Sequence, residues 1–323
     1  MLNFAILTAG NIAAQMANTV KHMNSELHPY AIAARDKARA SALALNNGFE
    51  KAYGSYDELF CDDKVDIIYI GSTHEMHYAH AKAALLHGKH VLCEKPLTTS
   101  APLAEELFAL AASKNLVIMD ATWTRYMPFV KMLQSVLDSG DIGAPCTLSA
   151  SFGFPLTHVE RMSSPVHAGG ALLDLGIYPL TFAAIAFGSD FESVHGECTK
   201  SDVGVDLYNA ITVKWKNGRI GTLTSNMQAE LPNLALIHGT NGHIEVPEFW
   251  HANMFTVYTN GKEPCIYDFP HEFTGYEYEV RELIHLIDAN KFESALLPHA
   301  ETLRILKVMD TLRNAWQIKY PFE

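Results

Sequence analysis

Three side chains in this sequence have the chemistry to hold or exchange a proton, namely Lys95, Asp174 and Tyr178. A tyrosine hydroxyl with an ordinary pKa near ~10 acts as a general acid or base at neutral pH only where a nearby cation favours the phenolate. Lys95 could supply that cation. Asp174 precedes Tyr178 by four residues, so one helical turn would place both side chains on one face. The simpler interpretations are a buried tyrosine, a surface lysine and a capping or ion-paired carboxylate.

A second candidate site is the turn Thr8-Ala-Gly-Asn-Ile-Ala13, which directly follows the apolar run 4–7. It is similar to the dinucleotide fingerprint G-x-G-x-x-A, with threonine in the first glycine position. Gly10 would let the backbone approach a pyrophosphate, and the free N–H groups of the helix that begins with Asn11 and Ile12 would face the phosphates. We expect the Cβ of Thr8 to crowd the turn and weaken this contact. An ordinary strand-to-helix turn is the alternative.

Arg35 follows the second apolar run, Tyr30-Ala-Ile-Ala-Ala34. Folds that prefer NAD usually place an acid here to bind the ribose 2′-OH, whereas a planar guanidinium pairs with a 2′-phosphate. Arg35 therefore favours NADP over NAD, although Asp36 comes next. The alternative is that Arg35 is an ordinary solvent-exposed arginine that does not bind a cofactor.

His74, His77 and His80 recur every three residues and so could lie near one another on a helix. A metal site would need a further ligand nearby, and His74-Glu-Met-His77 lacks the H-E-x-x-H spacing of metalloproteases. We therefore predict no metal site.

The elements that must position these residues alternate in type over the first 122 residues. Short β-type runs at 4–7, 30–34, 65–70, 90–93 and 116–119 are separated by helical patterns with recognisable ends, such as Ser55 with Glu58 three residues later. This alternation predicts a doubly wound parallel sheet, an α/β Rossmann domain over 1–122. Lys95, before Pro96, then lies where such sheets bind ligands, at the carboxyl end of a strand.

The pattern changes after a predicted helix at 128–137. Asn217-Gly218, Asn241-Gly242 and Asn260-Gly261 each separate two β-type runs, as type I′ hairpin turns do. With an apolar helix at 170–187 and a helical region at 276–316, the second half reads as an α+β domain over 123–323 with a large, mainly antiparallel sheet.

Composition excludes several classes of protein. The 323 residues are 48% hydrophobic, enough for two packed domains, and the formal net charge of −12 makes nucleic acid and acidic membranes poor partners. Five scattered cysteines without a C-x-x-C pair fit a reducing cytoplasm. The uncharged first twenty residues lack a basic signal-peptide start, and the apolar run 175–190 is too short and broken to span a bilayer.

Two further segments carry a family resemblance, Gly88-Lys-His-Val-Leu-Cys-Glu94-Lys95-Pro96-Leu97 and Gly169-Gly-Ala-Leu-Leu-Asp174-Leu-Gly-Ile-Tyr178-Pro179. With the first turn, they resemble the Gfo/Idh/MocA oxidoreductases in order and spacing along the whole chain. Within that family, Arg35, Trp123-Thr-Arg125 and the segment 174–178 look most like the dimeric dihydrodiol dehydrogenases and the NADP-dependent D-xylose 1-dehydrogenases.

The resemblance implies substrate binding by the second domain, pairing of subunits into a homodimer or homotetramer through the open-faced sheet, and a terminal helix that can return to the first domain. It also implies that Thr73, His77 and Glu94 border the cofactor and that Trp123 and Arg125 line the substrate pocket. Lys95, Asp174 and Tyr178 would carry the reaction.

The leading hypothesis is thus a cytoplasmic NADP-dependent dehydrogenase that transfers hydride between nicotinamide and a secondary alcohol of a small polyol, sugar or cyclic trans-diol. The cofactor would supply the hydride chemistry. Alternatives are a non-catalytic NADP sensor, suggested by the irregular turn at Thr8, and a reductase of another small carbonyl or imine.

Overall fold

The computed structural model describes residues 1–323 and divides the chain into two compact units. The first unit combines Met1–Thr98, Pro102–Thr122 and Glu272–Thr302, and the second combines Thr99–Ala101, Trp123–His271 and Leu303–Glu323. One boundary falls between residues 122 and 123, and residues 272–302 belong to the first unit.

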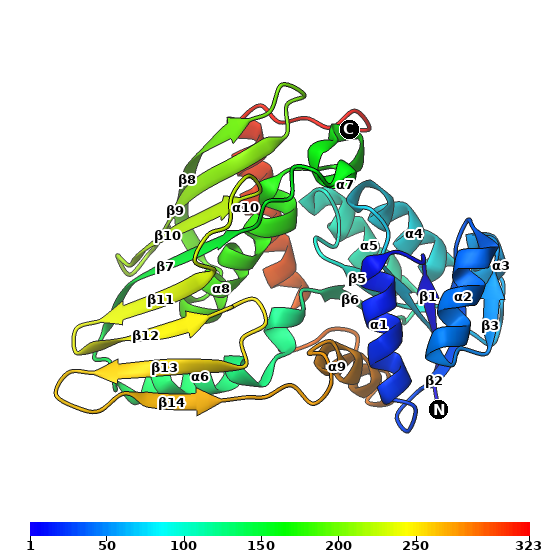
Figure 1. Ribbon diagram of the computed structural model, residues 1–323, viewed down its shortest axis with the longest axis horizontal. Helices are drawn as coiled ribbons and strands as arrows, with labels where there is room; N and C mark the ends of the chain where they lie inside the picture. The colour runs from blue at the N-terminus through cyan, green and yellow to red at the C-terminus, as the bar shows by residue number, and fades with distance from the viewer. The chain divides into compact units, whose positions relative to one another are not determined.

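A six-stranded parallel sheet forms the centre of the first unit, in the order β3-β2-β1-β4-β5-β6 (Figure 1). The chain order reverses between β1 and β4, and the carboxyl ends of strands at such a reversal form the crevice where α/β sheets bind ligands. The predicted doubly wound fold is confirmed. The strands are β1 Asn3–Leu7, β2 His28–Ala33, β3 Lys51–Tyr53, β4 Ile67–Ile70, β5 His90–Glu94 and β6 Ile118–Ala121.

Helices cover both faces of this sheet, α1 and α2 on one face and α4 and α5 on the other (Figure 1), as right-handed crossovers require. Ser55 and Glu58 form the predicted capping box at the start of α3, each side chain bonding the backbone of the other. The helices are α1 Asn11–His22, α2 Lys37–Asn47, α3 Tyr56–Phe60, α4 His74–Leu86, α5 Ala101–Ser113 and α9 Glu277–Asp288.

The second unit contains an eight-stranded sheet in the order β14-β13-β12-β11-β7-β10-β9-β8. All neighbouring strands are antiparallel except β7 and β10, so the prediction of a mainly antiparallel sheet is confirmed. The strands are β7 Pro145–Gly153, β8 Phe191–Lys200, β9 Asp206–Trp215, β10 Ile220–Asn226, β11 Leu234–Gly239, β12 Gly242–Pro247, β13 Met254–Thr259 and β14 Cys265–Asp268.

The three Asn-Gly pairs do connect hairpins, but they do not form the predicted type I′ turns. A type I′ turn needs positive φ at both central residues, and only the glycines have it, with φ of 84° at Gly218 and 75° at Gly261. At the β9–β10 connection the N–H of Trp215 bonds the carbonyl of Arg219, and that of Gly218 bonds the carbonyl of Trp215. A longer loop with a left-handed glycine thus replaces the two-residue turn.

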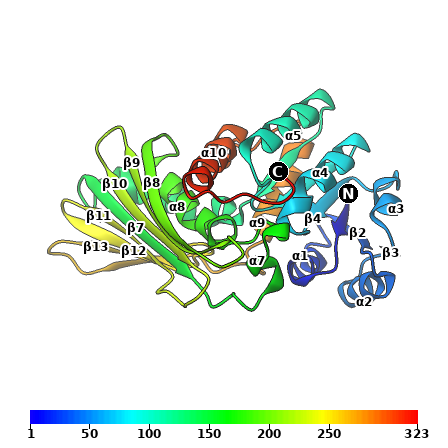
Figure 2. The same ribbon diagram turned by 90° about the horizontal axis from the view of Figure 1, so that it is seen from above.

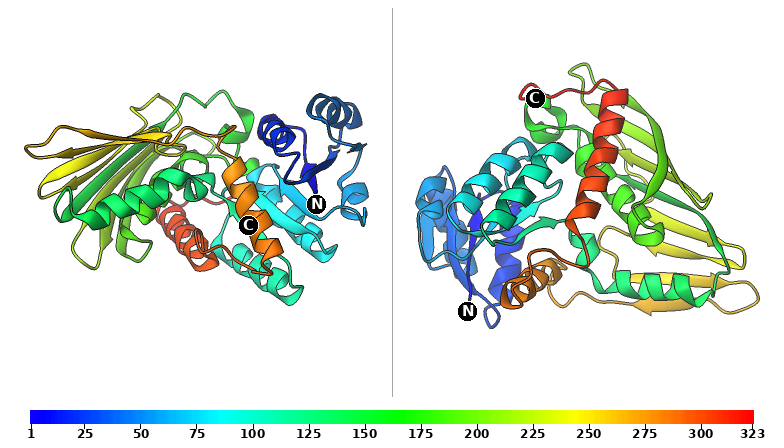
Figure 3. Two further views of the ribbon diagram at one scale, coloured as in Figure 1. Left: turned by 90° about the horizontal axis from the view of Figure 1, so that it is seen from below. Right: turned by 180° about the vertical axis from the view of Figure 1, so that it is seen from behind.

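One face of this sheet is covered by helices and the other carries none (Figures 2 and 3). Along β9 and β10, alternate residues such as Ile211, Val213 and Leu223 are buried toward α8, while Thr212 and Thr222 are exposed. The helices are η1 Trp123–Tyr126, α6 Pro128–Ser139, α7 Glu160–Ser163, η2 Pro165–His167, η3 Leu172–Gly176, α8 Ile177–Phe187 and α10 His299–Ala315, of which the residues from Leu303 onward belong to this unit.

The apolar helix predicted at 170–187 contains a change of helix type. Residues Leu172–Gly176 form a π-helix, and the α-helix α8 begins at Ile177. The stretch Pro165–Phe187 is long and apolar enough to cross a membrane, but 89% of its most apolar window is buried inside the protein, as in the core helix of a globular domain. The π-turn matters because such turns are frequent at functional sites.

Candidate functional site

The turn after β1 is held in a conformation that threonine rarely adopts. Thr8 has a φ of 104°, a region that favours glycine and strains a β-branched residue. Its N–H donates to the carbonyl of Ala33 at 2.9 Å, and its hydroxyl donates to the carbonyl of Gly71 at 3.0 Å. Thr8 therefore adopts the backbone conformation expected of glycine, and its hydroxyl adds a hydrogen bond between the ends of β1 and β4.

The N-terminus of α1 is suited to a phosphate group. Gly10 is its N-cap, no side chain caps the free N–H groups, and the first turn contains no acidic residue. A Cβ added to Gly10 would meet no atom within 4 Å, so the space beside the backbone is open. Asn11 is exposed and Ile12 packs beside Gly71. An uncapped helix end next to open space is the arrangement that binds a pyrophosphate, and these residues fit a dinucleotide.

The end of β2 adds positive charge beside this turn. Arg35 is exposed and hydrogen-bonds the hydroxyl of Tyr56, and the guanidinium of Arg39 donates to the carbonyl of Ala9 at 2.7 Å. Asp36, the one acid here, caps α2 by accepting from the N–H groups of Ala38 and Arg39 at 2.9 and 3.3 Å. The carboxylate that could have bound a ribose 2′-OH is therefore engaged in the helix cap.

The predicted cofactor neighbours on α4 behave differently from one another. Thr73 is half-buried at the start of the helix and donates its hydroxyl to Glu75 at 2.7 Å. His77 is fully buried, and its ring nitrogens face the carbonyls of Pro96 and Ser72 at 2.8 and 3.0 Å. Burial lowers the pKa of His77 to about 4, so the ring is neutral. Through these contacts His77 joins α4 to the turn after Lys95.

His74 and His80, the other members of the spaced trio, are also buried. Nδ1 of His80 bonds the hydroxyl of Ser72 at 3.0 Å, and its ring packs edge-on against Tyr56. Burial lowers the pKa of His80 to about 4. The helical spacing of these histidines therefore reflects packing against the sheet.

A group of buried acids surrounds Glu94 and Lys95 at the end of β5. Glu94 is 8% exposed and accepts from the hydroxyl of Tyr69. Burial raises the pKa of Glu94, and the charge of Lys95 partly offsets this rise. Burial also raises the pKa of Asp120 to about 6, although Thr122 donates to it at 2.8 Å.

Glu279, on α9, is the most isolated of these acids. It is fully buried, and neither carboxyl oxygen has a hydrogen-bond partner. Burial, followed by repulsion from Glu94 and Asp120, raises its pKa well above the usual range. The folded protein thus favours the protonated, neutral form of the Glu279 carboxyl group. It was not predicted, because its place beside Glu94 depends on the return of 272–302 to this unit.

In the second unit, Asp174 lies in the π-helix and is 6% exposed. Its two oxygens face the guanidinium of Arg161 at 3.1 and 3.3 Å, a bidentate ion pair. The predicted one-turn α-helical relation to Tyr178 is replaced by a π-turn followed by the start of α8. Arg161 is a partner that the sequence analysis missed.

Tyr178 lies at the first turn of α8 within an aromatic cluster. Its ring is 9% exposed and meets Phe152 edge-on, with ring centroids 5.1 Å apart. Phe152 also contacts Trp250 at 4.6 Å, and Trp250 contacts Phe154 at 5.8 Å. We call Phe152, Phe154 and Trp250 the aromatic wall. Its members come from β7 and from the segment after β12, so sequence spacing alone did not reveal it.

Trp123 and Arg125 both lie in η1. The Trp123 ring is 5.8 Å from that of His251, which in turn is 4.5 Å from Trp250, so Trp123 extends the aromatic wall through a histidine. Arg125 is 8% exposed. Trp123 thus joins the ring cluster that reaches Tyr178, and Arg125 is buried in the same short helix.

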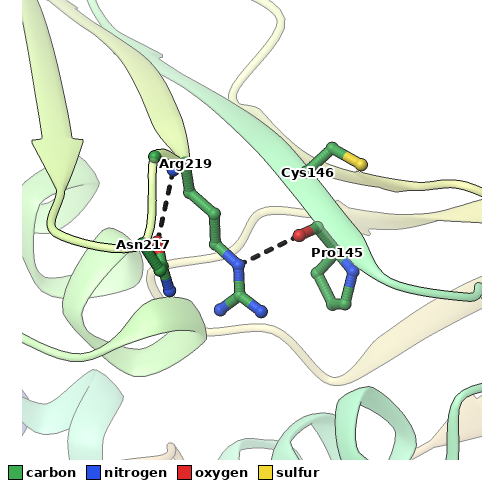
Figure 4. A pocket seen from close by; sticks show the side chains of 5 residues that line it. Pro145, Cys146, Asn217 and Arg219 are labelled. Atoms are coloured by element: carbon green, nitrogen blue, oxygen red, sulfur yellow. Dashed lines mark hydrogen bonds between the residues drawn. The ribbon is translucent and has the colours of Figure 1, made fainter.

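An open hollow elsewhere in the second unit is lined by Pro145, Cys146, Gly218 and the side chains of Asn217 and Arg219 (Figure 4). Nε of Arg219 donates to the carbonyl of Pro145 at 3.0 Å, and the Arg219 N–H donates to Asn217 at 3.2 Å. The guanidinium also lies 4.7 Å over the ring of Phe187. Arg219 is held by its own unit, and the hollow contains none of the predicted site residues.

Known proteins share this sequence and this fold. Residues 2–122 match the oxidoreductase family with an NAD-binding Rossmann fold, and residues 130–245 match the GFO/IDH/MocA C-terminal domain. Trans-1,2-dihydrobenzene-1,2-diol dehydrogenase from Bos taurus is 34% identical over 99% of this chain and 98% of its own, and the Mus musculus enzyme is 33% identical with the same coverage.

Solved structures agree with these matches. KijD10, a 3-ketoreductase from Actinomadura kijaniata in complex with NADP and TDP-benzene, has a TM-score of 0.89 and 25% identity, with 97% of each chain covered. Levoglucosan dehydrogenase, in complex with NADH and levoglucosan, shares the fold with a TM-score of 0.85 at 18% identity, over 98% of this chain and 97% of its own. The chain belongs to the Gfo/Idh/MocA family of NAD(P)-dependent oxidoreductases.

Proposed function

We propose that this protein is an NADP-dependent dehydrogenase that transfers hydride between nicotinamide and a secondary alcohol of a small cyclic diol, polyol or sugar. The observation that carries the proposal is the charge at the end of β2, where Arg35 and Arg39 lie beside the open α1 N-terminus and the one acid, Asp36, is engaged as a helix cap. NADP differs from NAD by a 2′-phosphate, for which guanidinium groups are suitable partners.

In this proposal Tyr178 exchanges the proton of the substrate hydroxyl. The Lys95 ammonium favours the phenolate form of Tyr178 and binds the substrate oxygen, and Asp174, oriented by Arg161, accepts a second substrate hydroxyl. Glu94 and Thr73 border the nicotinamide ribose. The bound cofactor supplies the hydride acceptor or donor.

The aromatic wall supports a cyclic substrate. The half-buried rings of Phe154 and Trp250 lie near Tyr178 around the buried ring of Phe152, and Trp123 and His251, also half-buried, continue the same cluster. Flat aromatic surfaces pack against the C–H face of a ring, while a few polar groups fix the orientation of its hydroxyls. The dihydrodiol dehydrogenases to which the chain is similar act on a compound of this kind, according to their name.

The first experiment is to follow the absorbance of reduced nicotinamide when the protein is mixed with NADP or NAD and a panel of aldoses, inositols and trans-cyclohexanediol. We expect NADP-dependent turnover, and we expect Tyr178→Phe to lower it by about 100-fold or more while NADPH binding is retained. Unchanged turnover in Tyr178→Phe would remove this tyrosine from the mechanism. Tight NADPH binding without turnover on any carbonyl, imine or alcohol would instead favour the sensor hypothesis.

The cofactor assignment has its own test. Arg35→Ala should reduce the preference for NADP over NAD by about tenfold, as expected for the loss of one charge-assisted bond to phosphate. Lys37→Ala removes the same charge two residues away and is the matched control, expected to leave most of the preference intact. Equal losses in both variants would indicate a general effect of charge and not a specific pair with Arg35.

The assignment of Lys95 and Tyr178 to one chemical step is tested by a double-mutant cycle. Lys95→Met and Tyr178→Phe are each expected to reduce turnover, and the combined variant should be little slower than the worse single variant, because residues that act as a unit are not additive. Fully additive losses would show that the two residues act in separate steps.

We further propose a cytoplasmic homodimer or homotetramer that pairs through the helix-free face of the eight-stranded sheet. That face exposes threonines such as Thr212 and Thr222 together with Ile220 and Ile266. Thr222→Arg should lower the mass measured by sedimentation, and an unchanged mass would exclude this surface from the subunit contact.

A further inference from the structure

A buried carboxylate outside the proposed site holds the segment that carries Asp174 and Tyr178. Asp206, the first residue of β9, is 1% exposed. Its Oδ2 accepts the backbone N–H of Leu172 at 2.7 Å and Nδ2 of Asn209 at 2.9 Å. Leu172 is the first residue of the π-helix. One oxygen on the sheet is thus bonded directly to the beginning of the functional segment.

The partner amide is itself fixed by a second strand. Oδ1 of Asn209 accepts from the hydroxyl of Ser225 at 2.8 Å, and both residues are fully buried and paired across β9 and β10. Since Ser225 donates to the amide oxygen, Nδ2 must point at Asp206. Ser225 therefore donates to Asn209 and Asn209 donates to Asp206, which also accepts the N–H of Leu172, so the hydrogen bonds of this network converge on the Asp206 carboxylate.

Two glycines allow the segment 170–178 to pack closely against this network. Gly170 has a φ of 124°, and a Cβ there would lie 2.2 Å from Oδ1 of Asp206. A Cβ on Gly176 would lie 3.1 Å from Oγ of Ser225. The two glycines flank Asp174, so the spacing of small residues in this motif matches the position of the network below it.

The charged and titratable groups around Asp206 come from three other parts of the unit. Burial raises the pKa of Asp206 to about 6, and its bonds to Asn209 and Leu172 and the charge of Arg313 on α10 oppose this rise. The charge of Asp206 also contributes to the raised pKa of Cys198 on β8 and of Tyr320 near the C-terminus. The donors from Asn209 and Leu172 and the charge of Arg313 therefore oppose the protonation of Asp206 that burial favours.

We propose that Asp206 is a positioning residue, which sets the place of Asp174 and Tyr178 through the N–H of Leu172. The effect on turnover rests on the function proposed above, whereas the hold on the segment does not. Asp206→Ala removes the acceptor and leaves two buried donors unpaired. Asp206→Asn retains an oxygen that can accept both bonds, so it serves as the rescue variant.

Amide hydrogen exchange of the free protein tests the hold directly. We expect Asp206→Ala to exchange about fivefold faster or more in peptides covering 171–178, in line with the loss of buried hydrogen bonds, with wild-type rates in the peptides of β13. Asp206→Asn should be close to the wild type. Unchanged exchange in 171–178, or an equal increase throughout the second unit, would overturn the proposal.

Steady-state kinetics then test the consequence. Asp206→Ala should lower kcat by about tenfold with little change in the KM for NADP, and Asp206→Asn should restore most of kcat. Failure of the Asn variant to restore either exchange or kcat would contradict the proposal. If Asp206→Ala does not fold, Ser225→Ala frees the Asn209 amide and is expected to raise exchange in the same peptides. An inactive wild type would refute the proposed function, while the exchange result would still judge the positioning.

Discussion

Asp206 and Glu279 are two buried carboxyl groups, one in each unit, in opposite surroundings. Asp206 accepts a backbone N–H and a side-chain amide, and an arginine lies near it. Glu279 has no hydrogen-bond partner and faces Glu94 and Asp120. The donors around Asp206 stabilise its charged form and fix a backbone N–H, whereas the surroundings of Glu279 favour its protonated form. Burial alone therefore does not define the role of an acid, because the donors around it decide between positioning and proton storage.

The largest expected effect comes from disrupting the hydrogen-bonded surroundings of Asp206. Gly170→Ala places a methyl group 2.2 Å from Oδ1 of Asp206 at a φ of 124°, so we expect a loss of about 2–4 kcal/mol in the free energy of unfolding. Gly10→Ala is the matched control, since its Cβ meets no atom within 4 Å and should leave thermal stability nearly unchanged while weakening NADPH binding. Similar melting temperatures for both variants would contradict the crowding at Gly170.

The pH dependence of stability tests the other side of the comparison, Glu279, whose carboxyl oxygens lack hydrogen-bond partners. Because the folded pKa of Glu279 lies above its unfolded value near 4.5, its contribution to stability is complete below pH 4.5 and is lost as the pH rises toward the folded pKa. Glu279→Gln cannot lose a proton, so it should remove a decline of up to about 1.4 kcal/mol per pH unit in that window. Urea unfolding at several pH values measures the difference, which should grow as the pH increases.

Glu277, two residues earlier in α9, gives the opposite control. Burial alone would raise its pKa, but the N–H groups of Phe273, Thr274 and Gly275 bond its carboxylate and lower the pKa. Its contribution is therefore present above pH 4.5 and lost as the pH falls. Glu277→Gln should cost about 1–3 kcal/mol at neutral pH. Equal signs for the two substitutions would refute the distinction between a charged and a neutral acid.

The smallest expected effect concerns the turn at Thr8, directly after β1. Thr8→Gly removes the strain of a positive φ, whereas Thr8→Ala keeps the strain and loses the bond to Gly71. We expect the glycine variant to be more stable than the alanine variant by about 1 kcal/mol in thermal unfolding. The reverse order would show that the threonine turn is unstrained.

Much of the fold could be predicted because local patterns and tertiary structure agree. The apolar runs gave five of the strands of the parallel sheet, whereas β3, Lys51–Tyr53, has only three half-buried residues and no apolar run to detect. The Asn-Gly pairs located the hairpins but not their turn types, since loop length sets the φ of the asparagine. The π-turn at Leu172–Gly176 escaped because a uniformly apolar stretch has no periodicity from which to recognise a change of helix type.

The site was predictable only where motifs carry it. Gly10, Lys95, Asp174 and Tyr178 lie in recognisable segments, but their partners do not. Arg161 is thirteen residues before Asp174, and Asp206, Trp250 and Glu279 reach their places through sheet pairing and the return of a late helix. His77 likewise has partners that the sequence does not indicate, the backbone carbonyls of Pro96 and Ser72.

The assignment of residues 272–302 to the first unit bears on how the chain matures during synthesis. Thr19 in α1 bonds Thr274, Glu26 just after α1 bonds Arg281, and the acids around Glu94 include Glu279. A nascent chain that has left the ribosome only as far as residue 271 therefore has a complete set of parallel strands without the helix that joins these groups. The first unit therefore cannot be complete before residue 302 has been translated, and a fragment ending at residue 122 should bind chaperones or aggregate.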